Sequence, residues 1–594
     1  MFLKIVRAAG GKGVKHEYVR LVQSYREDGK PKQRVVCNLG RKDLLAAHLD
    51  SLNRLLGGEP ASGRDKDLAE QIKEADSWNW GPMLAARSLW RELGLEEILD
   101  RLGGRGNSDG VVMSDRALVL VANRLCAPTS EHGLARWMET DFVCDRQGRR
   151  WVPPWREDEQ RLGSPLPRVR VELRWLKQWY RTLDQLHARK QQIEKELFLR
   201  LRDLFSLEVD LVFYDLTSTY FEGKGPAGLG AHGHSREGRP RNRQVLVGLV
   251  MVDGWPIAHH VFAGNWRDAK TVPKVLEDLR QRFGLRRVVF VGDRGMVTSD
   301  NLKLLRSKRQ GYLVGLQRRR REKIYRYMER ATGEWIECPG GITARDKAEP
   351  AKTLVQEVDS EQPGVRIFVV HSDERLGFER EQRLKAMQRV QEAFERLERR
   401  VGKGQLKAAE KVGAAAARIQ ARHHGYRYYD WEYKDGRFRF FEHPVNLKRE
   451  QAYEGKYVIQ TEEKNLSAAE AVRIYKELSE IERAFMNLKD VIEMRPIFHQ
   501  RPERVEAHLF VAALAFLLHR AMEKKLKAAG LDLSATEALQ AVHTVRVIDL
   551  ELINKKTKRV VTRGTARAKV ILSALGITDR NPPRGGRDGV GTIC

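Results

Sequence analysis

The sequence predicts a mixed α/β protein of several domains, and three observations support this. The chain has 594 residues, which is too long for one hydrophobic core. Short, β-branched apolar runs gather between residues 205 and 317, bounded by Gly, Asp and Pro. Stretches with three- and four-residue apolar spacing, typical of helices, lie on both sides. This order of elements is typical of a sheet covered by helices.

Six segments follow from these patterns. Two of them form a sheet domain that a long insertion interrupts. In chain order they are 1–62, a basic β-hairpin region; 63–204, a helical region; 205–317, the first part of the sheet domain; 318–465, a β-rich insertion with a helical hairpin; 466–525, the second part of the sheet domain; and 526–594, a helical region with a disordered tail.

The first segment contains a hairpin signal, Asp28-Gly29 between alternating apolar positions. In the helical segment, Asp76-Ser77 is expected to cap a helix that leads into LAARSLWRELGLEEILDRL. Aromatic side chains at helical spacing are usually core residues, so we favour packing over base stacking for a cluster of four tryptophans: Trp151, Trp155, Trp175 and Trp179.

Five strands are expected in 205–317: VDLVFYDLT, QVLVGLVMV, PIAHHVFAG, VVFVGDRG and GYLVGL. One helix, DAKTVPKVLEDLRQRFG, interrupts them, and Asp300 is the expected N-cap of a second helix. The two helices and five strands make this segment the sheet domain.

The insertion is expected to hold strands at TLVQEV, VRIFVVH, YYDWEYKDGRFRFFE and KYVIQTEE. Residues 379–422 have helical spacing, and Gly402 and Gly404 interrupt them, which favours a helical hairpin over one rod. A coiled coil is the alternative use of the apolar stripe from Leu384 to Val401. Ser467 is expected to cap the helix that follows the insertion.

Charge and cysteine usage restrict the class of protein. Lys and Arg number 108 against 80 Asp and Glu, a net charge of +28. This excess favours polyanionic partners, since phosphates are neutralised and counterions are released. Five scattered cysteines without a C-x-x-C pair fit a reducing cytoplasm.

No signal peptide or membrane span is expected. The longest apolar stretch near the end, between His508 and His519, has about 10 residues, fewer than the roughly 20 needed to cross a bilayer. We interpret it as a buried helix.

Three acidic residues stand where two strands and one helix could bring them together. Asp215 and Asp293 each follow an apolar run, and Glu482 lies in the helical stretch YKELSEIERAFMNLK. Three carboxylates can hold a pair of Mg²⁺ ions against a phosphate. Taken singly, Asp215 is better explained as a turn or cap residue, and Asp293 has the same ambiguity. Asp210 is a rival to Asp215, although it precedes the apolar run.

Tyr475, Glu482 and Lys489 are spaced seven apart, which places them on one stripe of a helix. A carboxylate between a phenol and an ammonium could bind metal and contact a phosphate. A solvated charged face is the alternative.

Several of these segments together resemble a known family. The ordered set YDLTSTYFEG, GHSREGRPRNRQVLVGLVMV, VFAGNWRDAKTV, VFVGDRGM and YKELSEIERAFMNLK is similar to DDE transposases of bacterial insertion sequences, in the insertion-sequence-four group and its insertion-sequence-1634 branch. The family's acidic triad falls on Asp215, Asp293 and Glu482. Its Tyr-Arg-Glu-Lys signature falls on Tyr475, Glu482 and Lys489, with Leu478 in place of the arginine. Arg473 or Arg483 could replace that arginine.

The resemblance implies a ribonuclease-H-like catalytic domain and in-line phosphoryl transfer with two Mg²⁺ ions, for which Mn²⁺ can substitute. It implies binding to double-stranded DNA at element ends and target, a homodimer in the synaptic complex, and a bacterial cytoplasmic location at the nucleoid. Phosphate or DNA contacts are expected from Tyr475, Lys489, Arg236 and Arg294. The alternatives are a metal-dependent endonuclease without strand transfer and a non-catalytic DNA-binding protein.

Weaker signals have simpler explanations. The pairs His232/His234, His259-His260 and His423-His424 lack a partner cluster at zinc spacing, so we do not expect a zinc site. Trp266 could stack on a flipped base, although a core role is the favoured interpretation. The glycine-rich segment 223–238 is expected to be a mobile loop near the site.

Overall fold

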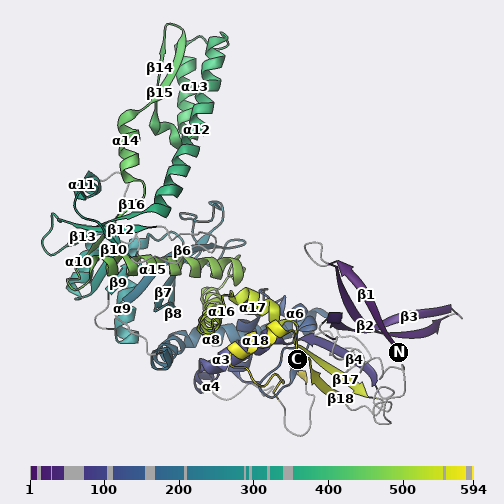
Figure 1. The fold of residues 1–594 in the computed structure, drawn as a ribbon. Coiled ribbons are helices and arrows are strands. Elements are labelled where there is room, and N and C mark those ends of the chain that lie inside the picture. The colour runs from purple at the N-terminus through teal and green to yellow at the C-terminus, as the bar shows by residue number, and fades with distance from the viewer. Residues whose placement is uncertain are drawn as a thin grey trace. The chain divides into compact units, whose positions relative to one another are not determined.

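Figure 1 shows the computed structural model of the chain. The structure describes these residues: 2–9, 15–27, 30–43, 45, 72–103, 111–153, 168–205, 211–285, 289–292, 298–316, 322–338, 352–552, 557–583 and 592–593. The chain divides into two compact units. Unit 1 comprises Met1–Glu208, Leu216–Trp266 and Arg483–Cys594, and unit 2 comprises Val209–Asp215 and Arg267–Glu482.

The expected N-terminal hairpin is confirmed and is part of a three-stranded sheet in unit 1. The hairpin strands are antiparallel and end at the pair Glu27↔Lys30, so that the Asp28-Gly29 turn lies between them but outside the described residues. The strands are β1 (Phe2–Ala9), β2 (Lys15–Glu27) and β3 (Lys30–Arg41), in that order in the sheet.

The expected helix cap at Asp76-Ser77 is wrong, because both residues lie in strand β4 (Ile72–Asn79). This strand pairs antiparallel with β17 (Arg546–Leu552), where Asp76 faces Asp549. The next helix begins at Gly81, with Pro82 in its first turn. Pairing with a strand more than 450 residues away decided the local structure, and no local pattern reports such a partner. The third strand of this sheet is β18 (Thr557–Val561), beside β17.

The helices of unit 1 enclose a large apolar core. LAARSLWRELGLEEILDRL forms two helices, α3 and α4, separated at Leu93 and Gly94. Of the four tryptophans, Trp151, Trp175 and Trp179 are at most 4% exposed, which fits the expected core role; Trp155 lies outside the described residues. The helices are α3 (Gly81–Glu92), α4 (Leu95–Gly103), α5 (Met113–Cys126), α6 (Leu134–Thr140), α8 (Arg168–Phe205), α16 (Pro502–Ala528), α17 (Ala535–Val542) and α18 (Ala566–Ala574).

Helix α16 is longer than the sequence indicates. It has 27 residues, so by length and composition it could cross a membrane, whereas the apolar run alone predicts a segment too short to do so. Of its most apolar 18-residue window, 83% is buried inside the protein. It packs against α5 and α8, so the expectation of a buried helix is confirmed.

The C-terminal segment holds two strands that the sequence pattern missed, β17 and β18. Of the expected disordered tail, residues 584–591 lie outside the described part, while β19 (Thr592–Ile593) pairs in parallel with β5 (Arg150–Trp151).

All five strands expected in 205–317 are present in a nine-stranded sheet. Strand β6 belongs to both units: Leu211–Asp215 lie in unit 2, and the rest lies in unit 1. The sheet order in unit 2 is β11-β12-β13-β16-β10-β9-β6, and in unit 1 it is β6-β7-β8. The strands from this segment are β6 (Leu211–Tyr220), β7 (Gln244–Val252), β8 (Trp255–Ala263), β9 (Val289–Gly292) and β10 (Gly311–Gly315).

Two helices accompany these strands, as expected: α9 (Val272–Phe283), preceded by a 3₁₀ turn (Asp268–Lys270), and α10 (Ser299–Ser307). The expected N-cap Asp300 is wrong by two residues. Thr298 has the extended backbone of a cap, and its hydroxyl accepts a hydrogen bond from the Asn301 N–H at 3.2 Å. Asp300 instead lies in the first turn, where the negative charge of a carboxylate interacts favourably with the helix dipole.

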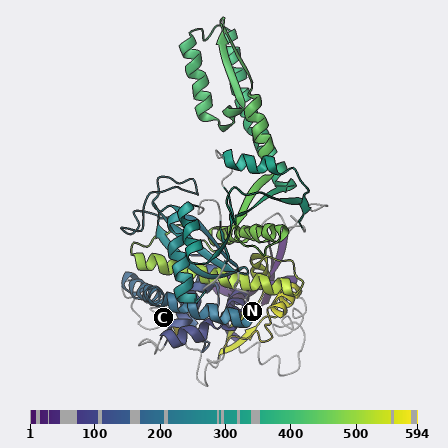
Figure 2. The ribbon, with the colours of Figure 1, turned by 90° about the vertical axis from the view of Figure 1, so that its left-hand side faces the viewer.

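The insertion contains both the expected strands and the expected helical hairpin. The strands β12, β13 and β16 extend the sheet of unit 2, and helix α11 precedes them. The hairpin helices α12 and α13, together with the β14–β15 hairpin, form an arm that projects from that sheet (Figures 1 and 2). The elements are α11 (Glu322–Arg330), β11 (Ile336–Glu337), β12 (Thr353–Val358), β13 (Arg366–Ser372), α12 (Asp373–Gly402), α13 (Ala409–Arg422), β14 (Tyr429–Lys434), β15 (Arg437–Glu442), α14 (Pro444–Tyr453) and β16 (Lys456–Thr461).

The apolar stripe of α12 is buried inside the arm itself. Phe394 is fully buried and contacts Phe438 and Phe440 of the β-hairpin. Met387, Val390, Leu397 and Val401 belong to the same cluster, whereas Leu384 is 53% exposed. The stripe therefore packs within its own chain and does not form a free coiled-coil face.

Candidate active site

Strand β6 carries Asp215 to an edge where parallel strands end. Within unit 2, β6 pairs in parallel with β9, and β9 with β10, so that Tyr214, Gly292 and Val314 form one row. Asp215 is the next residue after this row, and it is half-buried. Groups at the carboxyl ends of neighbouring parallel strands lie at one edge of a sheet, where ligands of α/β proteins commonly bind. Asp293 and Arg294 directly follow Gly292 but, like Asp210, lie outside the described residues.

Helix α15 (Ala468–Met486) lies against the same part of the sheet. Its residue Tyr475 stacks on Tyr457 of β16, with ring centroids 5.7 Å apart. A Cβ added to Gly315 would lie only 2.1 Å from the Tyr475 hydroxyl oxygen. Gly315 is the last residue of β10 and directly follows Val314. The Tyr475 phenol therefore lies next to the residue that follows the Tyr214–Gly292–Val314 row on β10, and Asp215 is the residue that follows the same row on β6.

The N-terminus of α15 is fixed as the sequence predicts. The Glu470 N–H donates to the Ser467 hydroxyl, and the Ser467 N–H donates to the Glu470 carboxylate, a capping box. Near the middle of the helix, the Lys476 ammonium donates to the Thr353 hydroxyl of β12 at 2.7 Å. These contacts hold the helix against the sheet of unit 2.

Glu482 and Leu478 face different surroundings on this helix. Glu482 is exposed, whereas Leu478 is only 9% exposed and belongs to the core. Glu482 lies seven residues after Tyr475, a rise of about 10.5 Å along an α-helix. Both belong to unit 2, as Asp215 does. An arginine at position 478 would direct a charged side chain into the core, which is costly without a partner.

Lys489 does not continue the α-helical stripe. Helix α15 ends at Met486, and Lys489 lies in a π-helical turn, Asn487–Val491. The wider turn changes the angle between successive side chains, so the seven-residue spacing no longer aligns Lys489 with Glu482. Its ammonium lies 3.0 Å from a carboxylate oxygen of Glu237 within unit 1, and the side chains are 14% and 7% exposed. No pattern in the sequence indicates this partner.

Arg236 lies beside the strand that carries Asp215. Its guanidinium donates to the backbone carbonyl of Leu216, the residue after Asp215. Its backbone N–H donates to the Ser218 hydroxyl at 3.3 Å. In the same loop, the Arg239 guanidinium lies over the ring of Tyr220, 4.5 Å from its centroid. The loop is thus attached to β6 by several contacts.

The remaining sequence candidates lie in ordinary packing environments. The ring of Trp266 stacks on Phe262 with centroids 5.4 Å apart, and the residue is half-buried. His259 is buried, with its Nδ1 atom 2.9 Å from the Glu194 carboxylate of α8.

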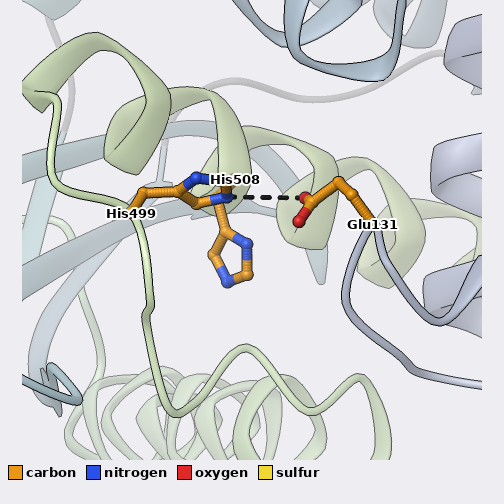
Figure 3. Close-up of side chains that lie close together, drawn as sticks. All are labelled: Glu131, His499 and His508. Atoms are coloured by element: carbon orange, nitrogen blue, oxygen red, sulfur yellow. Dashed lines mark ion pairs between the residues drawn. The ribbon is translucent and has the colours of Figure 1, made fainter. Parts of the chain in front are cut away.

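A second polar cluster, in unit 1, has no counterpart among the sequence candidates. Glu131, His499 and His508 lie with their ligand atoms within 4.8 Å of one another (Figure 3). His499 Nε2 is 3.4 Å from a Glu131 carboxylate oxygen. The three residues line a cavity of about 400 Å³ that also includes Arg124, Tyr180 and Arg495. Positions 131, 499 and 508 share no metal-site spacing, so no sequence signal could have grouped them.

The charges of this cluster are balanced by its own members. Burial raises the pKa of the Glu131 carboxyl, but His499, His508 and Arg124 outweigh burial and hold this pKa below its usual range. Burial, together with the charges of Arg124 and His499, lowers the pKa of His508 to about 3. Glu131 is therefore ionised and His508 neutral at neutral pH.

The cluster does not fit a metal ion. The His508 Nδ1 atom lies 3.3 Å from an Arg124 guanidinium nitrogen, and its Nε2 atom lies 3.1 Å from the Met494 carbonyl. A guanidinium can only donate, so Nδ1 accepts and Nε2 donates. A cation at Nδ1 would stand beside the Arg124 charge, and one at Nε2 would replace the proton bonded to Met494. We interpret the cluster as a structural hydrogen-bond network.

Two known families match the chain in the parts just described. The family described as "Transposase DDE domain" matches residues 212–518, more than half of the chain. The chain is therefore a DDE transposase.

The N-terminal region narrows the assignment. The family described as "IS1634 family transposase, N-terminal domain" matches residues 3–65, which include the β1–β3 sheet. The chain belongs to the IS1634-type DDE transposases, as the sequence motifs indicate.

Other comparisons add little. A search of the curated proteins finds no match. Among solved structures, the chain is similar to the "Cryo-EM structure of piggyBac transposase synaptic complex with hairpin DNA", with 9% sequence identity and a TM-score of 0.32, covering 78% of this chain and 79% of that one. No further conclusion rests on this likeness.

Proposed function

We propose that this transposase binds the ends of an insertion sequence, cleaves DNA strands there, and joins the 3′-hydroxyl ends to target DNA. The observation that carries the proposal is the meeting of two elements in unit 2. Asp215 stands just beyond the Tyr214–Gly292–Val314 row, and α15, which carries Glu482, lies against the end of β10 at Gly315. The arrangement of parallel strand ends and a crossing helix is consistent with a ribonuclease-H-like catalytic domain.

Asp215, Asp293 and Glu482 are the residues that would hold two Mg²⁺ ions, with Mn²⁺ as a substitute. The donor set fits this metal, because carboxylate oxygens are hard ligands that suit Mg²⁺. When bound, such a pair of ions lowers the pKa of the attacking water or hydroxyl and stabilises the leaving oxygen.

The other residues bind and orient the DNA in this proposal. Lys489 offers a compact positive charge for one phosphate. We assign the Tyr475 phenol, which reaches the end of β10, a hydrogen bond to a second phosphate oxygen. Arg236 holds the loop to the Asp215 strand and adds positive charge there, and Arg294, directly after Asp293, is assigned the same kind of contact.

The partners follow from charge and from the reaction. A net charge of +28 suits double-stranded DNA, at both element ends and target. We assign a homodimer to the synaptic complex, because two ends must be held together, and a cytoplasmic location at the bacterial nucleoid, where the DNA is.

Incubation of the protein with a supercoiled plasmid that carries candidate element ends, with Mg²⁺ or Mn²⁺, tests the proposal. Strand-transfer products from the wild type support it. Nicks alone would indicate an endonuclease, and a gel shift without cleavage would indicate a DNA-binding protein. Asp215→Asn and Glu482→Gln should each reduce the cleavage rate by at least about a hundredfold. DNA binding measured by gel shift should be unchanged, since the dispersed basic surface supplies the binding. Normal cleavage by either variant contradicts the assignment of the triad.

A further inference from the structure

The missing signature arginine leaves a phosphate contact without an obvious donor. Leu478 occupies its position and is buried in the core. Arg473, one replacement considered from the sequence, lies on the exposed side of α15 and is 2.8 Å from the Glu477 carboxylate. Arg483, the other replacement considered, is exposed near the end of the same helix. Another element offers a guanidinium that lies close to Lys489.

Arg495 is that guanidinium. Its Nη1 atom lies 2.8 Å from one carboxylate oxygen of Glu237, and the Lys489 ammonium lies 3.0 Å from the other. One buried carboxylate thus holds two cations that are six residues apart in the chain. All three residues belong to unit 1.

The three side chains keep a net positive charge and free donors. Lys489, Arg495 and Glu237 together carry one unit of positive charge; Arg495 also pairs with the 59% exposed Asp490 at 2.5 Å, which offsets part of this charge. Lys489 has three N–H donors and Arg495 has five; each side chain makes one ion pair with Glu237, and Arg495 Nη2 also donates to Asp490. Both cations remain partly accessible, at 14% and 27% exposure.

The loop that carries Glu237 is held by contacts within unit 1. Glu237 directly follows Arg236, whose guanidinium and backbone N–H are bonded to Leu216 and Ser218 of β6. These contacts of Arg236 hold the loop against the unit 1 part of β6, and Glu237 in the same loop pairs with the two cations. Displacement of both cations would leave the Glu237 carboxylate, whose side chain is 7% exposed, without a pairing charge, which is strongly unfavourable.

We infer that Arg495 supplies the phosphate-binding guanidinium absent at position 478, and that Glu237 is a positioning residue that holds Lys489 and Arg495 together on one DNA phosphate. This inference rests on the proposed function, because it takes the bound anion to be a phosphate of the element end.

A scan with neutral methylphosphonates tests the shared phosphate. The probe is duplex DNA from the flank of the coding region, with one backbone phosphate replaced at a time, and binding is measured by gel shift in Ca²⁺, so that cleavage plays no part. Wild type should lose on the order of tenfold in affinity at one phosphate beside the cleavage position. Lys489→Ala and Arg495→Ala should each lose part of the sensitivity to replacement at that same phosphate, and each should lower the salt slope by about one.

Arg501→Ala is the matched control. Arg501 is 60% exposed and its closest carboxylate, Glu503, is 3.6 Å away. The Arg501→Ala variant removes the same charge from a nearby position and should keep the wild-type sensitivity to replacement of that phosphate. An Arg495→Ala variant that behaves like Arg501→Ala overturns the inference, as does one that loses sensitivity at a different phosphate from Lys489→Ala.

Glu237 is tested by the same measurement. Glu237→Ala should lose the sensitivity at that phosphate, and Glu237→Asp should restore part of it, because a carboxylate returns to nearly the same place. Tighter binding at that phosphate by Glu237→Ala would mean that the carboxylate occupies the phosphate site instead, and would overturn the positioning role. Cleavage in Mg²⁺ is measured separately. If the wild type shows the expected phosphate pattern but does not cleave DNA, the proposed function is wrong, while the phosphate contact of Lys489 and Arg495 is still supported.

Discussion

The contact between Gly315 and Tyr475 predicts that Gly315→Ala displaces helix α15 from the end of β10. A Cβ at this position would lie 2.1 Å from the Tyr475 hydroxyl oxygen and 2.8 Å from the ring carbon that bears it. Ordinary contacts between such atoms are about 3.5 to 4.0 Å, so the ring would have to move by more than 1 Å. Tyr475 is stacked on Tyr457 and cannot swing away freely.

Overpacking of this kind costs about 1–3 kcal/mol. Hydrogen–deuterium exchange of peptides from β10 and α15 would therefore speed up by about fivefold to a hundredfold, since each 1.4 kcal/mol is a factor of ten. Cleavage should fall as well, because Glu482 lies on the displaced helix. Removal of the ring in Gly315→Ala/Tyr475→Ala should restore much of the exchange protection of β10, although not the phosphate contact of the phenol.

Gly377→Ala is the control, because no atom lies within 4 Å of its added Cβ and the residue lies in helix α12. It should stabilise that helix by about 0.5–1 kcal/mol. Unchanged exchange in Gly315→Ala, or equal losses in the single and double variants, would refute the packing of Tyr475 on Gly315.

Three further predictions concern other parts of the chain. Leu478→Arg should not increase cleavage and should speed exchange in α15 by at least about tenfold, because the 9% exposed position offers the charge no water; a gain of activity would contradict the buried position of this residue. Phe394→Ala should destabilise the arm by about 3–5 kcal/mol and open it to protease, with β6 to β10 unaffected; a protease-resistant arm would contradict its packing around Phe394. The pKa of His508 is lowered to about 3 in the folded protein, against its ordinary value of 6.5. Between these two pH values, His508 is protonated in the unfolded chain but not in the folded protein. Stability should therefore fall as pH drops from about 6.5 toward 3, and His508→Gln should show a weaker decline in melting temperature than wild type; an equal decline would contradict a neutral, buried His508.

The strands around the candidate site could be predicted because their signals are local. The runs that became β6, β9 and β10 are β-branched, apolar and bounded by Asp or Gly, and these features reflect burial on both faces of a sheet. The capping box at Ser467 is equally local, since its two partners are three residues apart.

Features that depend on distant partners could not be predicted. Asp76 and Ser77 suit a helix cap as well as a strand, and only pairing with β17 decides between them. The π-helical turn at Lys489 could not be predicted from the seven-residue spacing either, because one wider turn changes the direction of every side chain that follows it on the helix.

The Glu237 carboxylate illustrates the same limit for a functional site. Its cations stand 252 and 258 residues further along the chain, at Lys489 and Arg495, and neither shares a pattern with it. In the sequence, Glu237 is one acidic residue in a glycine- and arginine-rich segment that was expected to be a mobile loop. Only the structure shows that this segment contacts β6 through Arg236 and contacts Lys489 through Glu237.

Iron-directed cleavage of the protein backbone is the most direct measurement of whether Asp215, Asp293 and Glu482 share divalent ions. Fe²⁺ bound in place of Mg²⁺ produces radicals that cut the chain only near the metal, and fragment ends can be mapped by mass spectrometry. We expect cuts near all three positions, suppressed by excess Mg²⁺ and absent in Asp215→Asn. Cuts near position 215 without cuts near 482, or cuts concentrated around Glu131 and His499, would contradict the proposed metal site.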